Sequence, residues 1–303
     1  MNTLDAANLG RPTILERFWL RPVDSRRYSL LRIGFAIGCL ASLVHQWPHR
    51  LDLYSASGMA HNAGIRSGLS WLAVFRVFDS DWAVSVLFVF FAAAMTALLF
   101  GFLSRAAMLA VFVWLHASSL QIAPAYTGWD AVLRSVGLVL LLSPLGQIWS
   151  VDACLLRRAG RLPSTTAPVY GLYLVQWQIA VMYFVTAALK LSDTYWQSGE
   201  FAAYFYMSMF SLFPNPIYAQ WQTVSLLLSY FALAAELSLP LLLWCKRTRL
   251  LGFVVGGALH VSIAATSIIW VFSVVVLALY PAYLDDEEVQ RLVAWAKSRF
   301  GRS

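Results

Sequence analysis

The feature that most constrains this sequence is a series of apolar segments, each about as long as a membrane is thick, that recurs from one end to the other. A helix needs about 20 mainly apolar residues to cross the hydrocarbon core, and a helix satisfies its own backbone hydrogen bonds there. The 303 residues are 60% hydrophobic and only 12% charged, which leaves too little polar surface to cover a soluble globule. We therefore predict an all-α, polytopic integral membrane helical bundle.

Length and hydropathy predict eight transmembrane helices. The third and the eighth are shorter than the others, and the boundary between the last two falls near Ser267–Trp270. Tyr and Trp gather near many of the predicted ends, as expected where a helix meets the membrane interface. The spans are predicted at residues 29–47, 82–102, 106–121, 130–149, 169–190, 222–244, 250–268 and 269–284.

The distribution of basic residues predicts the orientation of these helices. Sixteen Lys and Arg residues lie in the segments on one side of the predicted membrane, and only four lie on the other side. The positive-inside rule then places both termini in the cytoplasm. This divides the chain into a cytoplasmic or interfacial segment (1–28), a transmembrane domain (29–284) and a cytoplasmic amphipathic tail (285–303).

Two flanking segments, 13–20 and 287–300, mix apolar and basic positions at helical spacing. This pattern is typical of helices that lie on a membrane surface, and equally of cytoplasmic helices packed against a domain. The outer segments 48–81 and 191–221 are long, and ordered loops of that length often cover functional sites. The second of them contains a turn signal at 213–216.

Several classes of function are excluded by what the sequence lacks. The net charge of +7 does not indicate nucleic-acid binding, because the basic residues sit between apolar segments and form no single face. Cys39, Cys154 and Cys245 are far apart and have no metal-ligand spacing. There is no phosphate-binding loop, paired metal-ligand motif or nucleophile elbow. We predict no metal site.

Ionisable residues in or beside the spans are the best indicators of function, because they are costly in a membrane. Asp130 and Arg134 are one helical turn apart, which predicts an internal ion pair that fixes the fourth helix near the outer boundary. Glu236 is a lone carboxyl near the middle of its span, and His260 follows glycines that permit close helix packing. Glu236 or His260 alone is compatible with a structural role as a hydrogen-bonded residue. Together with the other ionisable residues they form a candidate site, if their helices converge.

Lys190 ends a long apolar span at the predicted outer edge of the membrane. One interpretation is a lysine that extends its ammonium group among the lipid headgroups. However, Tyr183 and Gln176 lie seven and fourteen residues before it, on the same stripe of the helix. A partly desolvated lysine above such a stripe is suited to act as a general base.

The segment around Lys190 resembles a known family. Residues 178–199 (QIAVMYFVTAALKLSDTYWQSG) are similar to the signature of the membrane domain of vitamin K-dependent γ-carboxylases, also called the horizontally transferred transmembrane (HTTM) domain. The resemblance extends over about residues 25–284. Shorter matches lie at Leu31–Phe35, at Trp149–Asp152, at Glu236 with Pro240, and at His260 before the last helix.

The resemblance implies a cofactor and roles for individual residues. In these carboxylases the lysine that matches Lys190 deprotonates a vitamin K-type hydroquinone (menaquinol in bacteria). Oxygenation of the quinol then gives a strong base that removes a γ-proton from a peptide glutamate, and the carbanion captures carbon dioxide. The resemblance thus implies Lys190 as the catalytic residue and a cofactor site formed by Gln178, Tyr183, Trp196, Glu236 and His260.

Two departures argue against carboxylation of a protein glutamate. The large β-rich lumenal portion that follows the carboxylase membrane domain is not expected here, because the sequence ends at Ser303. The stretch 126–134 also lacks the histidine that stabilises the carbanion in carboxylases. The resemblance is therefore to short bacterial stand-alone members, some of which mature secreted peptides together with partner proteins. It implies a multi-pass protein of the cytoplasmic (inner) membrane that contacts membrane lipid and a secreted peptide or a partner membrane protein.

Two functions remain open at this point. The first is a quinol-dependent enzyme, γ-carboxylase-like, that modifies a peptide or small substrate at the outer face of the membrane. The alternative is a non-catalytic membrane subunit that binds lipid, quinone or a peptide in a peptide-maturation or export system. Lys190 discriminates between them, because catalysis needs its amine, whereas a scaffold should tolerate Lys190→Arg.

Overall fold

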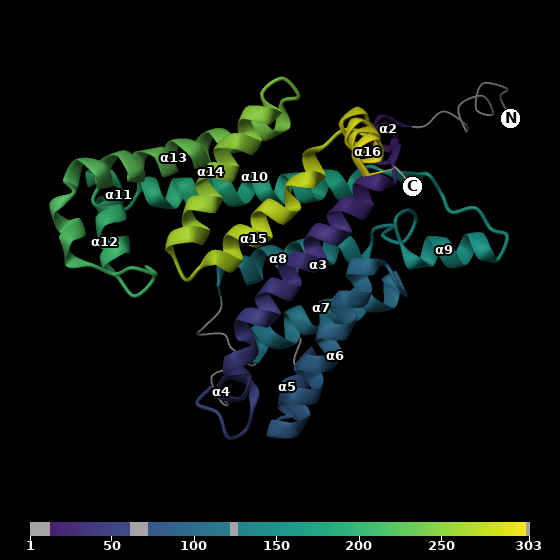
Figure 1. Ribbon diagram of the computed structural model, residues 1–303, viewed down its shortest axis with the longest axis horizontal. Coiled ribbons are helices and arrows are strands. Elements are labelled where there is room, and N and C mark those ends of the chain that lie inside the picture. The colour runs from purple at the N-terminus through teal and green to yellow at the C-terminus, as the bar shows by residue number, and fades with distance from the viewer. Residues whose placement is uncertain (1–12, 61–71, 122–126, 301–303) are drawn as a thin grey trace, which may run out of the picture.

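The structure is a computed structural model that describes residues 13–60, 72–121 and 127–300. Nearly all of it is helical (Figure 1). The only sheet in these ranges is a two-stranded antiparallel pairing of β1 (Pro22–Asp24) with β2 (Thr166–Pro168). The predicted all-α class is therefore confirmed.

Each of the eight predicted spans coincides with a helix. In the described ranges, five of these helices are long and apolar enough to cross a membrane, which makes this a multi-pass helical membrane protein. The other three are shorter or less apolar, so the count of eight spans and the cytoplasmic position of both termini stay predictions. The five are α3 (Arg26–Gln46), α6 (Asp81–Phe100), α10 (Tyr170–Leu191), α13 (Gln222–Trp244) and α14 (Arg249–Thr266), and the three are α7 (Ser104–Gln121), α8 (Gly128–Leu141) and α15 (Trp270–Leu279) with its extension η5 (Tyr280–Tyr283).

The fourth span is shorter than predicted. The sequence pattern extends it to residue 149, but α8 ends at Leu141, and residues 142–150 form turns and bends. Pro144 explains the early end, because proline cannot continue the helix and it disfavours helical backbone in the residue before it. The chain then enters the short helix α9 (Val151–Arg158).

The eight helices form two halves. Helices α3, α6, α7 and α8 pack as successive neighbours and form the first half, and α10, α13, α14 and α15 form the second half in the same way. Contacts of α8 with α10 and of α15 with α3 join the halves. Successive helices run in alternate directions (Figure 1), so the bundle has two ends. We name them the Arg26 pole, where α3 begins, and the Lys190 pole, where α10 ends.

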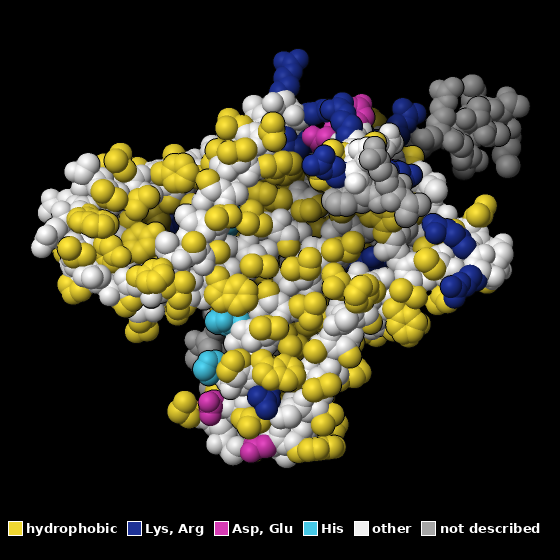
Figure 2. Space-filling model, viewed as in Figure 1, with side chains coloured by type: hydrophobic (Ala, Val, Ile, Leu, Met, Phe, Trp, Pro, Cys, Tyr) yellow, Lys and Arg dark blue, Asp and Glu magenta, His cyan; other side chains and the backbone are white. Residues whose placement is uncertain are grey.

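The short elements lie at the two poles. Helix α16 packs against α3 at the Arg26 pole, and α2 precedes α3 at the same end (Figure 1). Basic side chains gather over this end of the molecule and over α9 (Figure 2), on the side that the sequence predicts to be cytoplasmic. The short helices are α2 (Ile14–Trp19), η1 (Trp47–His49), α4 (Arg50–Tyr54), α5 (Val74–Val77), α11 (Thr194–Ser198), α12 (Phe201–Met207), η4 (Pro216–Gln220) and α16 (Asp286–Phe300).

Both flanking segments predicted to be helical are helical. Helix α2 begins with a capping box in which Thr13 and Glu16 hydrogen bond reciprocally, and none of its residues is buried. At the Lys190 pole, the predicted outer segment 191–221 folds into α11, α12 and η4. Asn215 caps η4 by accepting a hydrogen bond from the Ile217 backbone N–H at 2.9 Å. Part of the other long outer segment, residues 61–71, lies outside the described residues.

Candidate functional site

Helix α10 carries three polar side chains along the face that points into the bundle. Gln176 and Tyr183 are buried, and the Lys190 side chain is 25% exposed. Their spacing of seven residues places them on one stripe. Gln176 donates a hydrogen bond from Nε2 to the Ala282 carbonyl oxygen at 2.7 Å, which ties the middle of α10 to η5. The stripe predicted from the sequence thus runs from the bundle interior to the Lys190 pole.

Lys190 is held by a carboxylate and an indole ring. Its Nζ lies 2.5 Å from Oε1 of Glu236 on α13, and 4.6 Å from the ring centroid of Trp196 on α11, a favourable cation–π distance. Thr186 Oγ1, one turn before Lys190, lies 3.3 Å from the other Glu236 oxygen and 2.9 Å from the Met182 carbonyl oxygen, so its single proton can go to either. The Glu236 side chain is only 10% exposed. The amine is therefore fixed in position above an almost completely buried carboxylate.

A second polar cluster lies deeper in the same half. The hydroxyl of Tyr183 lies 2.6 Å from His260 Nε2 and 2.7 Å from the hydroxyl of Tyr280. His260 is 1% exposed, and its Nδ1 has no hydrogen-bond partner among the described residues. Gly256 on α14 is what lets Tyr280 come so close, because any side chain there would overlap the Tyr280 hydroxyl. The cluster links α10, α14 and η5.

Lys190 and Glu236 line a cavity of about 290 Å³ between α10, α13 and α14, covered by α11 and α12. Aromatic rings form much of its wall. Trp196 stacks on Phe201 at 3.9 Å between ring centroids, and Phe201 stacks on Phe205 at 5.9 Å. His260 lies behind the wall, with its ring 5.6 Å from that of Phe272, which lines the cavity.

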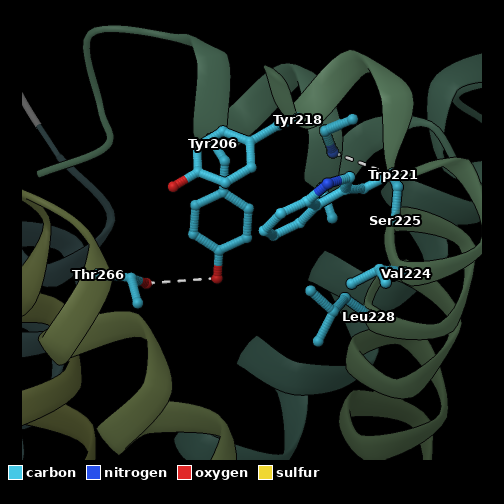
Figure 3. A pocket seen from close by; sticks show the side chains of 9 residues that line it. Tyr206, Tyr218, Trp221, Val224, Ser225, Leu228 and Thr266 are labelled. Carbon is cyan, nitrogen blue, oxygen red and sulfur yellow. Dashed lines mark hydrogen bonds between the residues drawn. The ribbon is translucent and has the colours of Figure 1, made fainter. Parts of the chain in front are cut away.

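A second chamber of about 240 Å³ adjoins this cavity (Figure 3). Tyr206, Tyr218 and Trp221 line it, and none of the described residues around it is charged. The Tyr206 hydroxyl lies 3.3 Å from Thr266 Oγ1, and both side chains also border the Lys190 cavity. The segment after α12 is anchored here, because Leu212 N–H donates to the Thr266 carbonyl oxygen at 2.9 Å.

The structure brings together most of the site residues predicted from the sequence. Lys190, Trp196 and Glu236 meet at the cavity, and Tyr183 and His260 meet in the cluster behind it. Gln178 does not join either group. It lies twelve residues before Lys190, which is about a third of a turn away from the stripe on an α-helix, and it is not among the residues that line the cavity.

Asp130 and Arg134, both in the described part of the chain, do not form the predicted ion pair. Asp130 Oδ2 instead accepts hydrogen bonds from the backbone N–H of Thr127 at 3.1 Å and from its hydroxyl at 2.7 Å, in the capping box of α8. Arg134 donates from a terminal guanidinium nitrogen to Ser119 Oγ on α7 at 3.0 Å. Each residue therefore has a hydrogen-bond partner other than the predicted one.

Three residues of the site were missed by the sequence reasoning. Thr186 lies four residues before Lys190, so the helical stripe should have included it. Tyr280 and Thr266 gave no signal, because a tyrosine near a span end or a threonine at a helix end is unremarkable in a membrane protein. Only the convergence of separate helices gives these two a place in the site.

Comparison with known proteins gives a match over most of the chain: the HTTM domain matches residues 20–287. The chain belongs to the HTTM domain family. Its HTTM domain contains all eight predicted spans, and all the residues that line the Lys190 cavity. No curated protein and no solved structure matches the chain. The family predicted from residues 178–199 is therefore confirmed.

Proposed function

We propose that this HTTM domain is a quinol-dependent membrane enzyme, similar to the membrane domain of vitamin K-dependent γ-carboxylases. In this proposal it modifies a peptide or small substrate at the outer face of the inner membrane, with Lys190 as the base. The observation that carries the proposal is the position of the Lys190 amine, between a buried carboxylate and an indole ring at an aromatic-walled cavity.

The cavity fits a flat, mainly apolar ring. Its volume of about 290 Å³ is near the lower end for small-molecule pockets, and Trp196, Phe201 and Phe205 offer aromatic faces. Among the described residues that line it, only Lys190 and Glu236 are charged, which matches a ligand with few polar atoms. Leu228 and Phe231 line the cavity and are also about half-exposed on the surface of α13. A long apolar tail could therefore pass between them into lipid.

Lys190 and Glu236 carry the proton chemistry in this proposal. A general base must be a neutral amine, and in this proposal Oε1 of Glu236, 2.5 Å from Nζ, is the group that receives the ammonium proton. The neutral amine would accept a proton from the hydroxyl of a bound quinol, and Trp196 would stabilise the resulting ammonium. When bound, the reduced quinone supplies the electrons for dioxygen-dependent chemistry.

The alternative function is a non-catalytic membrane subunit that binds lipid, quinone or a peptide for a partner. The chamber in Figure 3 is the observation that favours it. Tyr206, Tyr218 and Trp221 surround an uncharged space that can hold an apolar side chain without any chemistry. In that case the Lys190–Glu236 pair only connects α10 to α13.

The deciding experiment combines ligand identification with turnover. Quinone would be extracted from the detergent-purified protein and identified by mass spectrometry, and dioxygen consumption would be measured with menaquinol and bicarbonate. We expect bound quinone in the wild type, and a loss of turnover of roughly 100-fold or more in Lys190→Ala, as for removal of a general base. Lys190→Arg should be equally inactive, because guanidinium does not release its proton.

Lys246→Ala is the matched control, since it removes an exposed lysine at the opposite pole and should keep full turnover. If wild type and Lys190→Ala both carry only bulk phospholipid after menaquinone is added, the quinol enzyme is contradicted. Bound quinone without turnover, together with normal binding by Lys190→Arg, would instead favour the non-catalytic subunit.

A further inference from the structure

Two of the short sequence matches, Leu31–Phe35 and Trp149–Asp152, meet at the Arg26 pole, far from the Lys190 cavity. Arg32 is completely buried. Its guanidinium donates one hydrogen bond to the Leu145 carbonyl oxygen at 2.8 Å and another to the Trp149 carbonyl oxygen at 2.6 Å. Gly101 at the end of α6 has a left-handed backbone (φ 68°), and a side chain there would overlap this guanidinium. The buried cation is thus built into the junction of α3, α6 and the segment after α8.

The charge of Arg32 is not neutralised by direct pairing. Within the described part of the chain, it forms no ion pair within 4.0 Å, and its hydrogen-bond acceptors are neutral carbonyls. Asp152 is the nearby carboxylate, but its two oxygens accept hydrogen bonds from the backbone N–H groups of Leu103 and Ser104, both at 2.8 Å. Asp152 therefore serves to cap the start of α7.

A groove of about 440 Å³ lies against this junction, between the end of α6 and α9. Ser150 borders both the groove and Gly101, so the buried guanidinium is directly behind its wall. Arg157 and Arg158 line the groove. Both are exposed, and neither forms an ion pair with any described residue. The rest of the lining is mainly apolar and consists of Phe100, Trp149, Val151, Cys154 and Leu155.

We propose that this groove binds an anionic phospholipid of the leaflet at the Arg26 pole. The phosphate is held by Arg157 and Arg158, whose planar guanidinium groups suit phosphate oxygens, and the acyl chains run along Phe100 and Leu155. Arg32, Arg157 and Arg158 outnumber the one nearby carboxylate, Asp152, so the site carries a net positive charge. Basic pockets between helices on the cytoplasmic side are typical sites for anionic lipid headgroups. A zwitterionic lipid has a cationic group of its own, so it gains less binding free energy from these arginines.

Native mass spectrometry of the full-length protein in detergent tests this directly, with titrations of dioleoylphosphatidylglycerol and dioleoylphosphatidylcholine. We expect phosphatidylglycerol to bind about 10-fold more tightly in the wild type. The double variant Arg157→Gln/Arg158→Gln should lose roughly 10- to 30-fold of that affinity, since each basic side chain near a membrane surface contributes about a tenfold factor or less. Its binding of phosphatidylcholine should fall by no more than about threefold, so that the two lipids bind the variant nearly equally.

Two controls separate a built site from general attraction between charges. Arg17→Gln/Arg299→Gln removes two exposed arginines from α2 and α16 at the same pole and should keep wild-type affinity. Glycerol 3-phosphate, which lacks acyl chains, should not compete. Equal binding of the two lipids by the wild type would overturn the proposal, as would an equal loss of affinity in both double variants or competition by glycerol 3-phosphate.

Discussion

The two halves of the bundle differ in what fills them. Of the twelve largest fully buried side chains in the described part of the chain, only Tyr183 belongs to the second half. The others, such as Tyr28, Phe88 and Trp114, belong to the first half or to the short helices attached to it. The second half instead contains the Lys190 cavity and the chamber beside it. The interior of the first half is therefore a packed core, whereas the interior of the second half leaves space for a ligand.

Both halves contain clusters of aromatic residues, but the rings pack against one another in the first half and also border a cavity in the second. In the first half Phe75 packs on Tyr54 at 4.4 Å and on Phe88 at 6.1 Å, so that the rings cover one another. In the second half Trp196, Phe201 and Phe205 stack in a row that also lines the cavity. Composition alone does not distinguish these uses. The difference depends on whether neighbouring elements close the space beside the rings.

The same substitution should therefore have different effects in the two halves. Phe88→Ala removes a completely buried ring and should lower the free energy of unfolding by about 3–5 kcal/mol. Phe205→Ala should cost only about 1 kcal/mol, because its ring already borders an open space and loses fewer contacts. Unfolding of both purified variants in mixed micelles measures this difference. Equal losses would show that the second half is packed as tightly as the first.

The Lys190–Glu236 pair gives a second comparison, because it places charges inside the half that is less densely packed. Lys190→Met leaves Glu236 almost buried without its partner, and should lower the free energy of unfolding by roughly 2–3 kcal/mol. The double variant Lys190→Met/Glu236→Leu should recover most of this loss, since no unpaired carboxylate remains. A double-mutant cycle on the same unfolding assay measures the coupling. Additive losses would mean that the two residues act independently.

The architecture was largely predictable from the sequence, and the reason is physical. Apolar length and internal backbone hydrogen bonding leave few alternatives in a membrane, so all eight predicted spans coincide with helices. The main error in a boundary came from Pro144, which ends α8 at Leu141 although the apolar run continues. Local backbone chemistry thus overrode hydropathy at that point.

The site was predictable only in part. Helical periodicity placed Tyr183 and Lys190 on one stripe, because spacing within a helix is fixed. The contacts of Lys190 with Glu236 and of Tyr183 with Tyr280 join residues 46 and 97 positions apart, and no local pattern encodes such pairings. Asp130 is a different case, because its partner Thr127 is only three residues away, in a capping box that the sequence pattern contains. Which of two compatible partners a side chain takes is decided by the packing of the helices.

An ion pair that is open to water should contribute less to stability than the Lys190–Glu236 pair at the cavity. The contacts of α16 at the Arg26 pole test this. Asp285 caps α16, accepting a hydrogen bond from the Glu288 N–H at 3.0 Å, and its Oδ2 lies 3.1 Å from Lys246 Nζ. Burial tends to raise the pKa of Asp285, but the hydrogen bonds from the Glu288 N–H and Lys246 outweigh it, so its pKa is lowered. The stabilisation is therefore fully present above the ordinary aspartate pKa of about 3.9, and it is lost as the pH falls through the lowered value.

Amide hydrogen exchange in α16, compared between pH 6 and lower pH, measures this effect. Protection should fall below about pH 4 in the wild type, and Asp285→Asn should show weaker protection at pH 6 with a smaller further loss on acidification. Asp79→Asn, far from α16 in the first half, should behave as the wild type does. Because the carboxylate of Asp285 is partly open to water, with 28% of its side chain exposed, the change should stay local to α16. A loss of protection that spreads to α10 and α13 would show that the whole second half depends on the Asp285–Lys246 contact. The ion pair in water would then be as important for stability as the ion pair inside the bundle.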